Sequence, residues 1–446
     1  MSGARAQVAV LGAGPAGCVA ARQLGQSGVD VLLIDAGDRG GGHVMESFPP
    51  SGAALAEDIG LLSRICGVSE GPAARMHLHW REAAEIRKFE GDGPLLLRRR
   101  EMHGALRSEA LAHARHMPAR VRQVSATGTG AEVVTDAGAV SCAMVVDARG
   151  RHAVKRKGSD LVGLAFAASD DVPDHSMWLE ALPDAWLWAC GTGMGRLHGV
   201  LFQRAETMAG LTAQARQAGV CRLLGQSASL AHVTDIKVAR PVAAGLACVE
   251  DPVPAPRHVL IGDAALARDP IASHGLVHAI RSGVQAAVAV RTVLDPDGDT
   301  HAALSFLRTK HVQAVASARL ATARAYRDQT RFTGPFWAQY GEETAPEAAP
   351  QAGPGPITLA RPLTRAPVLD GDRIRWAAAI YLPASGDFFT RLGPVTALDI
   401  ASACRPAAPL NTVAARLGRM HAAPLVFDVL TLLDRGGAIA QVPGPA

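Results

Sequence analysis

The sequence predicts a mixed α/β fold, and three observations support this prediction. The run Gly12-Ala13-Gly14-Pro15-Ala16-Gly17 follows the apolar segment QVAVL and opens a helical stretch, and Asp35 ends the next apolar segment, VLLID. Short apolar segments then alternate with helical ones to about residue 340. A second strand-to-turn signal, Gly262-Asp263-Ala264, lies far downstream. We therefore expect parallel strands joined by helices, in a Rossmann-like domain that binds a dinucleotide.

The glycine run carries a specific chemistry. The first glycine permits a tight turn, the second lets the backbone approach a pyrophosphate, and the third lets the helix pack on the strand. The phosphate charge then lies at the helix N-terminus, where free N–H groups and the helix dipole favour an anion. A carboxylate at the end of the second strand accepts from ribose hydroxyls. The predicted dinucleotide ligands are Gly12, Gly14, Pro15, Ala16, Gly17 and Asp35.

The order of segments predicts three parts. The dinucleotide-binding domain takes residues 1–75, 95–160 and 250–340, and an inserted antiparallel sheet facing the substrate takes residues 76–94 and 161–249. Residues 341–356, GEETAPEAAPQAGPGP, form a linker, because proline, glycine and charge in this proportion cannot build a packed element. Residues 357–446 form a small C-terminal domain.

The C-terminal domain is predicted to be a small α+β module. A strand-like IRWAAAIYL precedes three helical segments, near residues 396–404, 410–420 and 424–434, and a short IAQV strand follows Gly436 and Gly437. This order resembles a winged-helix module. The segment has few basic residues, so we expect a docking or packing role and not DNA reading.

Composition limits the class of protein. The 446 residues carry a formal charge of +4 with the basic residues dispersed, which argues against nucleic acid as a partner. The seven cysteines form no CxxC pair, so we expect reduced thiols, no structural zinc and a cytoplasmic location. No apolar run reaches about 18 residues, and the N-terminus carries the glycine turn in place of a signal-peptide cleavage site, so we expect no membrane association.

A second motif indicates a flavoprotein. The segment HVLIGDAALARDPIASHGLVHAIRSGVQAA resembles the second FAD motif of the para-hydroxybenzoate hydroxylase superfamily. The resemblance implies that Asp263 accepts from the ribityl chain and that Gly275, at a helix start, leaves N–H groups for the electron-rich edge of the isoalloxazine. Arg99, in RRREMHGALRSEAL, corresponds to an arginine that contacts the cofactor. The resemblance also implies that reduced FAD captures O2 as a C4a-hydroperoxide; whether NAD(P)H or a reductase supplies the electrons stays open.

Two further segments narrow the resemblance. GHVMESFPPSG, residues 42–52, resembles the GESLPP segment that lies against the flavin in tryptophan halogenases and in flavoproteins that mature quinone cofactors, and it keeps Glu46 and Ser47. Asp147-Ala148-Arg149-Gly150 stands where aromatic hydroxylases carry a DG motif, and a DA-x-G form is typical of these same groups. The chain is similar to the monooxygenases of quinohemoprotein amine dehydrogenase maturation, which act on a tryptophan of a protein small subunit.

Halogenase chemistry is the main alternative. Flavin halogenases carry WxWxIP, and Trp186-Leu187-Trp188-Ala189-Cys190-Gly191 keeps both tryptophans but not Ile-Pro. Spacing by two predicts both indoles on one face of a strand. A halogenase also needs a lysine beyond the flavin tunnel; only Lys88 lies in roughly the right region, and it is predicted to be solvated.

The remaining candidates are histidines. His274 directly precedes Gly275 and is the predicted general base for an indole, with His43 and His278 as further candidates. His77 and His79 alternate as on a strand and therefore share a face, but the sequence nominates no third metal ligand. The predicted catalytic residues are thus His274, Glu46 and Trp188; the predicted cofactor ligands include Ser47, Arg99, Asp263 and Gly275; and no metal is expected.

These observations predict an FAD-dependent monooxygenase that hydroxylates an aromatic side chain, with tryptophan in a peptide or protein substrate, such as an amine dehydrogenase small subunit, as the favoured target. The enzyme alternatives are a flavin halogenase or a hydroxylase of small aromatics, and, further off, a saturase or reductase of polyprenyl chains. A flavin-bound chaperone that only presents the peptide is the non-enzyme alternative.

Overall fold

The computed structural model describes residues 4–37, 44–153, 160–169, 172–193, 195–338 and 355–442. Within these ranges the chain forms two compact units. The first unit contains residues 1–287 and 314–343, and the second contains residues 288–313 and 344–446. The C-terminal end of α6 (Gly275–Leu294) and the N-terminal end of α7 (Thr300–Arg327) therefore group with the C-terminal segment. The sequence did not indicate this grouping.

The first unit contains the predicted Rossmann-like domain. Its sheet has the order β8 (Arg115–Pro118), β2 (Val31–Asp35), β1 (Ala4–Leu11), β11 (Gly138–Asp147), β10 (Ala131–Thr135) and β9 (Val121–Ala126), and β19 (His258–Leu260) pairs with β11. The β8, β2, β1, β11 and β19 pairings are parallel, whereas β9, β10 and β11 form an antiparallel meander. Residues 8–11 and 31–34 are buried on both faces, as parallel strands covered by helices require.

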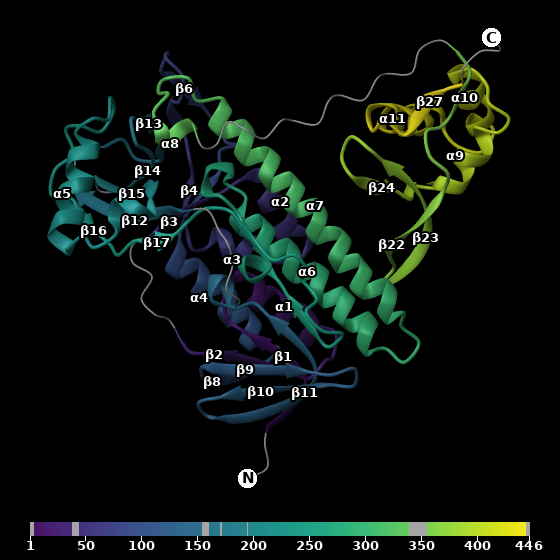
Figure 1. Cartoon of the computed structure of the whole chain (residues 1–446), viewed down its shortest axis with the longest axis horizontal. Coiled ribbons are helices and arrows are strands. Elements are labelled where there is room, and N and C mark those ends of the chain that lie inside the picture. Colours follow the sequence, from purple (N-terminus) through teal and green to yellow (C-terminus); the bar gives the residue numbers. More distant parts are fainter. Residues whose placement is uncertain are drawn as a thin grey trace. The chain divides into compact units, whose positions relative to one another are not determined.

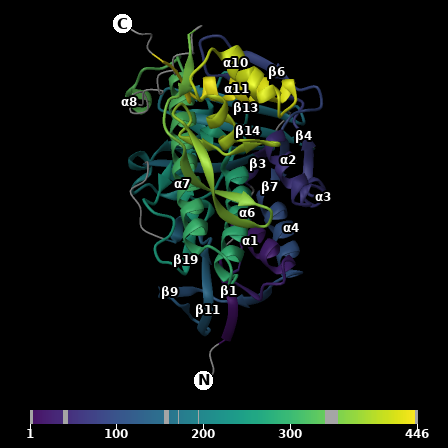
Figure 2. The same cartoon turned by 90° about the vertical axis from the view of Figure 1, so that its right-hand side faces the viewer.

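Three helices lie beside this sheet. The helix α1 (Pro15–Gln26) connects β1 to β2 and packs against α4 (Arg99–Leu111) and β11. The helix α6 (Gly275–Leu294) crosses α1 at Gly283, where a side-chain Cβ would lie 2.7 Å from the Ala16 carbonyl oxygen. Only glycine permits this approach, so Gly283 determines how closely α6 packs on α1. Figures 1 and 2 both show α6 beside α7 (Thr300–Arg327).

A second large sheet is built mainly from strands that follow β11 in the chain, and two of its strands come from residues 75–88, before β11. Its order is β16 (Lys237–Val238), β12 (Leu161–Ser169), β15 (Arg196–Arg204), β14 (Ala185–Thr192), β13 (Ser176–Leu182), β5 (Arg75–His79) and β6 (Glu85–Lys88), with β17 (Val242–Ala243) beside β12. All pairings are antiparallel except that of β5 with β13. The helix α5 (Ala213–Leu224) contributes to the apolar core on one face of the sheet, together with Phe166 and Trp178.

Smaller elements complete the first unit. A three-stranded sheet has the order β3 (Met45–Phe48), β7 (Leu95–Arg98), β4 (Ser69–Pro72), and the short helices α2 (Pro50–Asp58) and α3 (Leu62–Cys66) follow β3. The strands β18 (Ala247–Cys248) and β20 (Leu266–Ala267) pair with each other, and α8 (Pro335–Ala338) follows α7. The 3-10 turns η1 (Gly150–His152), η2 (Ala205–Met208), η3 (Gly262–Ala264) and η4 (Pro270–Ala272) lie between these elements.

Besides the ends of α6 and α7, the second unit contains short strands and three helices within residues 355–442. β22 (Thr364–Asp370), β23 (Arg373–Leu382) and β24 (Asp387–Phe389) form a sheet, β25 (Arg391–Leu392) pairs with β26 (Val395–Thr396), and β21 (Ile357–Leu359) pairs with β27 (Ile439–Gln441). The helices are α9 (Ala397–Ala403), α10 (Leu410–Gly418) and α11 (Ala423–Arg435), at the three places the sequence predicts. Thr396 and Asp399 cap α9 reciprocally in a capping box. The last strand of the chain, β27, pairs in antiparallel fashion with β21, the first strand of the C-terminal segment.

None of the helices in the described ranges is long and apolar enough to cross a membrane.

Candidate functional site

A basic cleft opens at the carboxyl ends of β1, β2 and β11. It has a volume of about 660 Å³, and the turn before α1, the loop after β2, the first half of α4 and the turn after β11 form its walls. Ligands of open parallel sheets bind at this edge, beyond the carboxyl ends of the strands. Its lining residues are 12–14, 34–37, 99, 100, 103, 104, 107, 119–121 and 148–150.

The three glycines of the predicted fingerprint have three distinct surroundings. Gly12 has φ +96°, and a Cβ there would lie 2.7 Å from the Ala148 carbonyl oxygen. A Cβ on Gly17 would lie 2.0 Å from the Gly12 carbonyl oxygen and 3.1 Å from the Ala148 Cβ. A Cβ on Gly14 meets no atom within 4 Å. Gly12 therefore makes the turn, Gly17 makes the helix packing possible, and Gly14 leaves an open space for a ligand against the backbone.

The N-terminus of α1 is suited to an anion. Gly14 is its N-cap and offers no side-chain acceptor, Pro15 is the first helical residue, and no acidic residue lies in the first turn. The backbone N–H groups of this turn have no helical partner, and the dipole gives them partial positive charge. A phosphate in the space beside Gly14 would accept from these groups.

Asp35 lies in the wall of the cleft. Its carboxylate accepts from the backbone N–H of Ala13 at 3.3 Å and of Gly37 at 3.1 Å, which fixes the loop after β2 against the glycine turn. Arg107 lies 3.8 Å away, and the Asp35 side chain is 20% exposed. Asp35 also raises the pKa of the Cys18 thiol, which burial and this negative charge bring to about 12.

The cleft is strongly basic. Among the described residues that line it, Asp35 is the one acidic residue, against five arginines: Arg99, Arg100, Arg107, Arg120 and Arg149. A ligand with negative charge is therefore favoured over a neutral one. A dinucleotide with a pyrophosphate fits this charge, as it fits the glycine turn.

Glu46 and Arg99 form an ion pair between β3 and the first residue of α4. The Arg99 guanidinium donates to Glu46 Oε1, and the Arg99 backbone N–H donates to the Val44 carbonyl at 3.0 Å. Burial raises the pKa of the Glu46 carboxyl, but the charges of Arg99 and His103 outweigh it and hold the pKa below its ordinary value. The charge of Glu46 is also the main reason that the pKa of Arg99 is raised. Both groups are thus charged at neutral pH, and Glu46 orients the arginine that lines the cleft.

A second ion pair holds the turn after β11. The side chain of Arg149 donates to both oxygens of Asp147, at 3.0 and 2.6 Å, and Asp147 is 1% exposed. His258 Nε2 lies 3.6 Å from the same carboxylate. Burial raises the pKa of Asp147, but hydrogen bonds from His258 and Arg149 hold it below its ordinary value. The departure from a DG motif at this position is visible in the sequence, but the sequence did not predict that Arg149 lines the cleft.

The second predicted FAD motif lies outside the lining of this cleft. Asp263 is in η3, has a side chain that is 44% exposed and lies 3.6 Å from Arg151 Nε. Its negative charge contributes to the raised pKa of Arg99, so the two predicted ligands interact electrostatically. Gly275 is the first residue of α6, it is exposed, and a Cβ there would meet no atom within 4 Å. Ser47 is half-buried on β3 and does not line the cleft.

The predicted general base does not join the other two catalytic candidates. His274 is exposed, and its Nδ1 pairs with the Ala272 carbonyl. No hydrogen bond or ion pair connects it to Glu46 or Trp188 among the described residues. His43 lies outside the described residues, and His278 is half-buried on α6.

The two tryptophans of β14 share one face of the inserted sheet, as their spacing predicts. Trp186 is 1% exposed and stacks on Phe202 with ring centroids 3.8 Å apart. Trp188 is half-buried and packs both against this aromatic cluster and against an apolar cluster that contains Met45 of β3. The face with Trp188 therefore lies beside the strand that carries Glu46.

His77 and His79 share the opposite face of the sheet. His77 stacks on Trp178 with ring centroids 5.3 Å apart, and His79 Nδ1 lies 3.4 Å from Glu180. No group of three potential metal ligands occurs in the described part of the chain. Both histidines therefore lie on the face of the sheet that holds the Trp178 core. The sequence also led us to expect a substrate-facing surface at these histidines, and this stays a prediction.

None of the described lysines is among the residues that line the cleft. Lys88 is exposed on the edge strand β6, and Lys237 is exposed on β16. Lys310 lies in the second unit, 3.8 Å from Asp387. Lys155 and Lys157 are outside the described residues.

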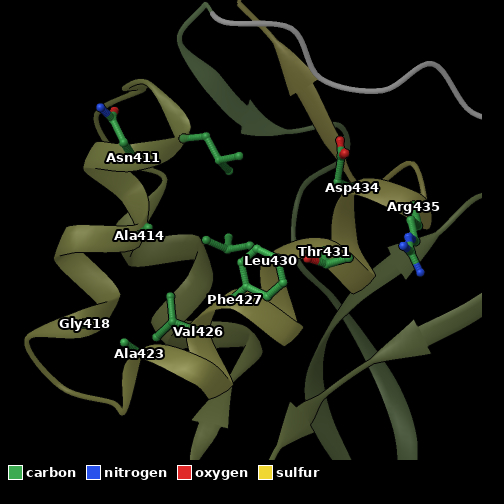
Figure 3. Close-up of a pocket in the computed structure, with 11 residues that line it drawn as sticks. Asn411, Ala414, Gly418, Ala423, Val426, Phe427, Leu430, Thr431, Asp434 and Arg435 are labelled. Atoms are coloured by element: carbon green, nitrogen blue, oxygen red, sulfur yellow. The ribbon is translucent and has the colours of Figure 1, made fainter.

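The second unit has a concave surface of a different kind. A groove of about 540 Å³ lies between α10 and α11 and is lined mainly by apolar side chains, among them Val426, Phe427 and Leu430. Figure 3 shows these side chains between the two helices, with Asp434 and Arg435 at one end. Phe427 is 70% exposed. The groove has no cluster of titratable groups, so the basic cleft is the better candidate for chemistry.

The sequence matches the model of the NAD(P)-binding Rossmann-like domain over residues 10–58. No curated protein sequence matches the chain. Solved structures match it over most of its length. The peptidyl tryptophan dihydroxylase QhpG, essential for tryptophylquinone cofactor biogenesis, is 22% identical, with a TM-score of 0.75, over 97% of this chain and 100% of QhpG.

Two further structures have the same fold. The flavin-dependent halogenase CmlS is 17% identical, with a TM-score of 0.78, over 98% of this chain and 96% of CmlS. Klebsiella pneumoniae HpxO, complexed with FAD, is 17% identical, with a TM-score of 0.59, over 76% of this chain and 95% of HpxO. The fold is that of flavin-dependent monooxygenases and halogenases. The predicted Rossmann-like α/β fold is thereby confirmed.

Proposed function

We propose that this protein is an FAD-dependent monooxygenase that hydroxylates a tryptophan side chain of a peptide or protein substrate. The observation that carries the proposal is the combination of the open space at Gly14 with the five-arginine cleft, in a fold that matches QhpG over 97% of the chain. QhpG, whose substrate is a peptidyl tryptophan, has this fold from end to end.

The residues of the cleft fit FAD. The N-terminal turn of α1 would hold the pyrophosphate, Asp35 would accept from ribose hydroxyls, and Arg99, oriented by Glu46, would contact the cofactor from α4. Asp263 and the N-terminus of α6 are proposed to receive the ribityl chain and the electron-rich edge of the ring. When bound and reduced, the flavin supplies the oxygen chemistry; NAD(P)H or another source of reduced flavin would provide its electrons, and O2 is the co-substrate.

The protein itself has three tasks in this reaction. It keeps the cofactor in place through the cleft, excludes water from the reacting ring, and positions an electron-rich aromatic ring. Trp188 is the proposed wall of the substrate site, because it is half-buried on the sheet face that adjoins β3. The inserted sheet is accordingly proposed to face the substrate. Glu46 acts on the reaction through Arg99, and His274 stays the candidate for proton removal.

Halogenation is the second candidate, because CmlS also matches nearly the whole chain. Lys88, the one lysine that the sequence nominated for the position beyond the flavin tunnel, is exposed on the edge strand β6. A halogenase needs a lysine at the substrate, so the solvent exposure of Lys88 favours oxygenation. The resemblance of residues 357–446 to a winged-helix module stays a proposal.

The test is a turnover assay in air with FAD, a flavin reductase, NADH and a tryptophan-bearing amine dehydrogenase small subunit. Intact-mass and fragment spectrometry read the product, with bromide present in a parallel reaction. The proposal predicts a gain of one or two oxygens on a single tryptophan and no halogen. Incorporation of bromine would contradict it in favour of a halogenase, and oxidation of small phenols or indoles without any change in the peptide would contradict the substrate assignment.

A further inference from the structure

A buried hydrogen-bond chain links three distant parts of the first unit. The indole N–H of Trp186, on β14, donates to the hydroxyl of Tyr326 at 3.1 Å, and this hydroxyl donates to Asp269 Oδ2 at 3.4 Å. Tyr326 comes from the last turn of α7, and Asp269 from the loop before α6. The three side chains are 1%, 4% and 1% exposed. Their polar atoms are therefore removed from bulk water and depend on one another.

Asp269 also organises the loop that leads into α6. Its side chain is the N-cap of η4 and accepts the backbone N–H of Ile271 at 3.0 Å. Ile271 packs against the aromatic cluster that contains Trp186 and Tyr326. Two residues later Ser273 takes a left-handed conformation, with φ +49°, and α6 starts at Gly275. The carboxylate thus ties the start of α6 to the aromatic cluster of the inserted sheet.

Asp269 is a carboxyl with few charged neighbours. Burial raises its pKa to about 6, and the hydrogen bonds from Ile271 and Tyr326 and the charge of Arg151 offset only part of this effect. Arg151 is shared with other partners, because it donates to the Gly245 and Ala244 carbonyls and lies 3.6 Å from Asp263. No other charged or titratable group contributes to the Asp269 environment among the described residues.

We propose that Asp269 and Tyr326 are positioning residues that hold the N-terminus of α6 ready for the flavin and make flavin binding dependent on the ionisation of Asp269. This inference rests on the proposed FAD site. Burial in the closed loop is what raises the pKa of Asp269, so the protonated carboxyl favours the closed loop and the ionised carboxylate favours a loop that opens towards water. FAD binding to the closed loop therefore weakens as the pH rises through the pKa of Asp269.

The pH dependence identifies the residues. In the wild-type protein, the Kd for FAD is expected to rise between pH 5 and pH 7 with a midpoint near 6, by up to about tenfold for each pKa unit that separates the closed loop from the open one. Asp269→Asn removes this step. Tyr326→Phe moves the midpoint upwards, because the Tyr326 hydroxyl lowers the pKa of Asp269. A role in packing alone would not move a titration midpoint.

Trp337→Phe is the matched control. Trp337 belongs to the same aromatic cluster and is 6% exposed, but its indole N–H donates to the Leu182 carbonyl at 3.0 Å and not into this chain. This variant is expected to lower the Tm while keeping the midpoint of the FAD titration. The apo proteins give an independent reading, because unfolding free energy as a function of pH reports the Asp269 titration without FAD.

The raised pKa of Asp269 determines how the free energy of unfolding of the apo protein changes with pH. An aspartate whose folded pKa exceeds its unfolded value contributes stability that is lost as the pH rises from about 4 to about 6, and Asp269→Asn is expected to lack this change. A wild-type Kd for FAD that is flat from pH 5 to 7, or a midpoint that Tyr326→Phe leaves unmoved, would overturn the inference while leaving the FAD site intact. A wild-type protein that binds no FAD at any pH would instead refute the proposed function, and the apo titration would still report Asp269.

Discussion

Alanine at two glycines of the same turn is expected to have opposite effects on folding and on FAD binding. A Cβ on Gly17 would overlap the backbone oxygen of Gly12 at 2.0 Å, whereas a Cβ on Gly14 meets nothing within 4 Å. Overpacking typically costs about 1–3 kcal/mol, and Gly17→Ala belongs at or above the upper end, because the opposing atom is backbone and cannot swing away. We expect a fall in the apo Tm of about 5 °C or more.

Gly14→Ala is expected to leave the apo protein nearly as stable as the wild type. Gly14 has φ −74° and ψ 175°, a conformation open to any residue. Replacing glycine reduces the entropy of the unfolded chain by about 0.4–1 kcal/mol, and alanine is a poorer N-cap by a similar amount, so the two effects cancel. The added methyl occupies the space reserved for the pyrophosphate. Loss of one charge-assisted hydrogen bond, about 1.5–3 kcal/mol, corresponds to a Kd for FAD about 10- to 100-fold higher.

Thermal unfolding without FAD and a fluorescence titration with FAD measure both effects on the same samples. The reasoning fails if Gly14→Ala binds FAD as the wild type does, because the cleft beside Gly14 would then not hold the phosphate. It also fails if Gly14→Ala destabilises the apo protein as much as Gly17→Ala, since the two sites would then not differ in packing.

Three other predictions follow from the ion pairs and thiols. Because the pKa of Glu46 is lowered on folding, its contribution to the free energy of unfolding is present at neutral pH and is lost as the pH falls below about 4.5. In unfolding experiments at several pH values, Glu46→Gln should reduce this loss of stability in acid. An unchanged loss would show that the ion pair with Arg99 does not stabilise the fold. Asp147→Ala should cost about 2–4 kcal/mol in urea unfolding, somewhat less than a fully buried pair because the Arg149 side chain is 24% exposed; a cost under about 0.5 kcal/mol would show that the pair is dispensable. Iodoacetamide at pH 8 should label the exposed Cys66 in the native protein and spare the buried Cys18, whose pKa is about 12. Mass spectrometry of the peptides identifies the labelled cysteines, and modification of Cys18 would contradict the packing of α1.

The sequence predicted the features that depend on a few neighbouring residues. The glycine turn, its strand and its helix lie within residues 4–26, so their geometry follows from local steric rules, and the structure has the tight turn at Gly12 and the close packing at Gly17. The role of Gly14 beside a pyrophosphate stays a prediction. The alternation in β14 likewise placed Trp186 and Trp188 on one face, because a strand has a period of two. The three helices of the second unit were found from their apolar spacing.

Features that depend on distant pairs were not predictable in this way. Glu46 and Arg99 are 53 residues apart, and no periodicity indicates that β3 and β7 pair so that this ion pair forms at the start of α4. The bond from Tyr326 to Asp269 spans 57 residues and needs the packing of α7. His274 was chosen for its position before Gly275, but side-chain direction depends on the left-handed turn at Ser273, which sequence spacing does not reveal.

The most direct test of the proposed function is the mass of a tryptophan-bearing small subunit after reaction with the FAD-loaded protein, reduced flavin and ¹⁸O2. The proposal predicts one or two ¹⁸O atoms on a single tryptophan, and none when the protein carries Gly14→Ala and FAD is kept below the raised Kd. Unlabelled oxygen on the ring, which would come from water, a halogen on the ring, or an unmodified peptide beside oxidised flavin would contradict the assignment as a peptidyl tryptophan monooxygenase.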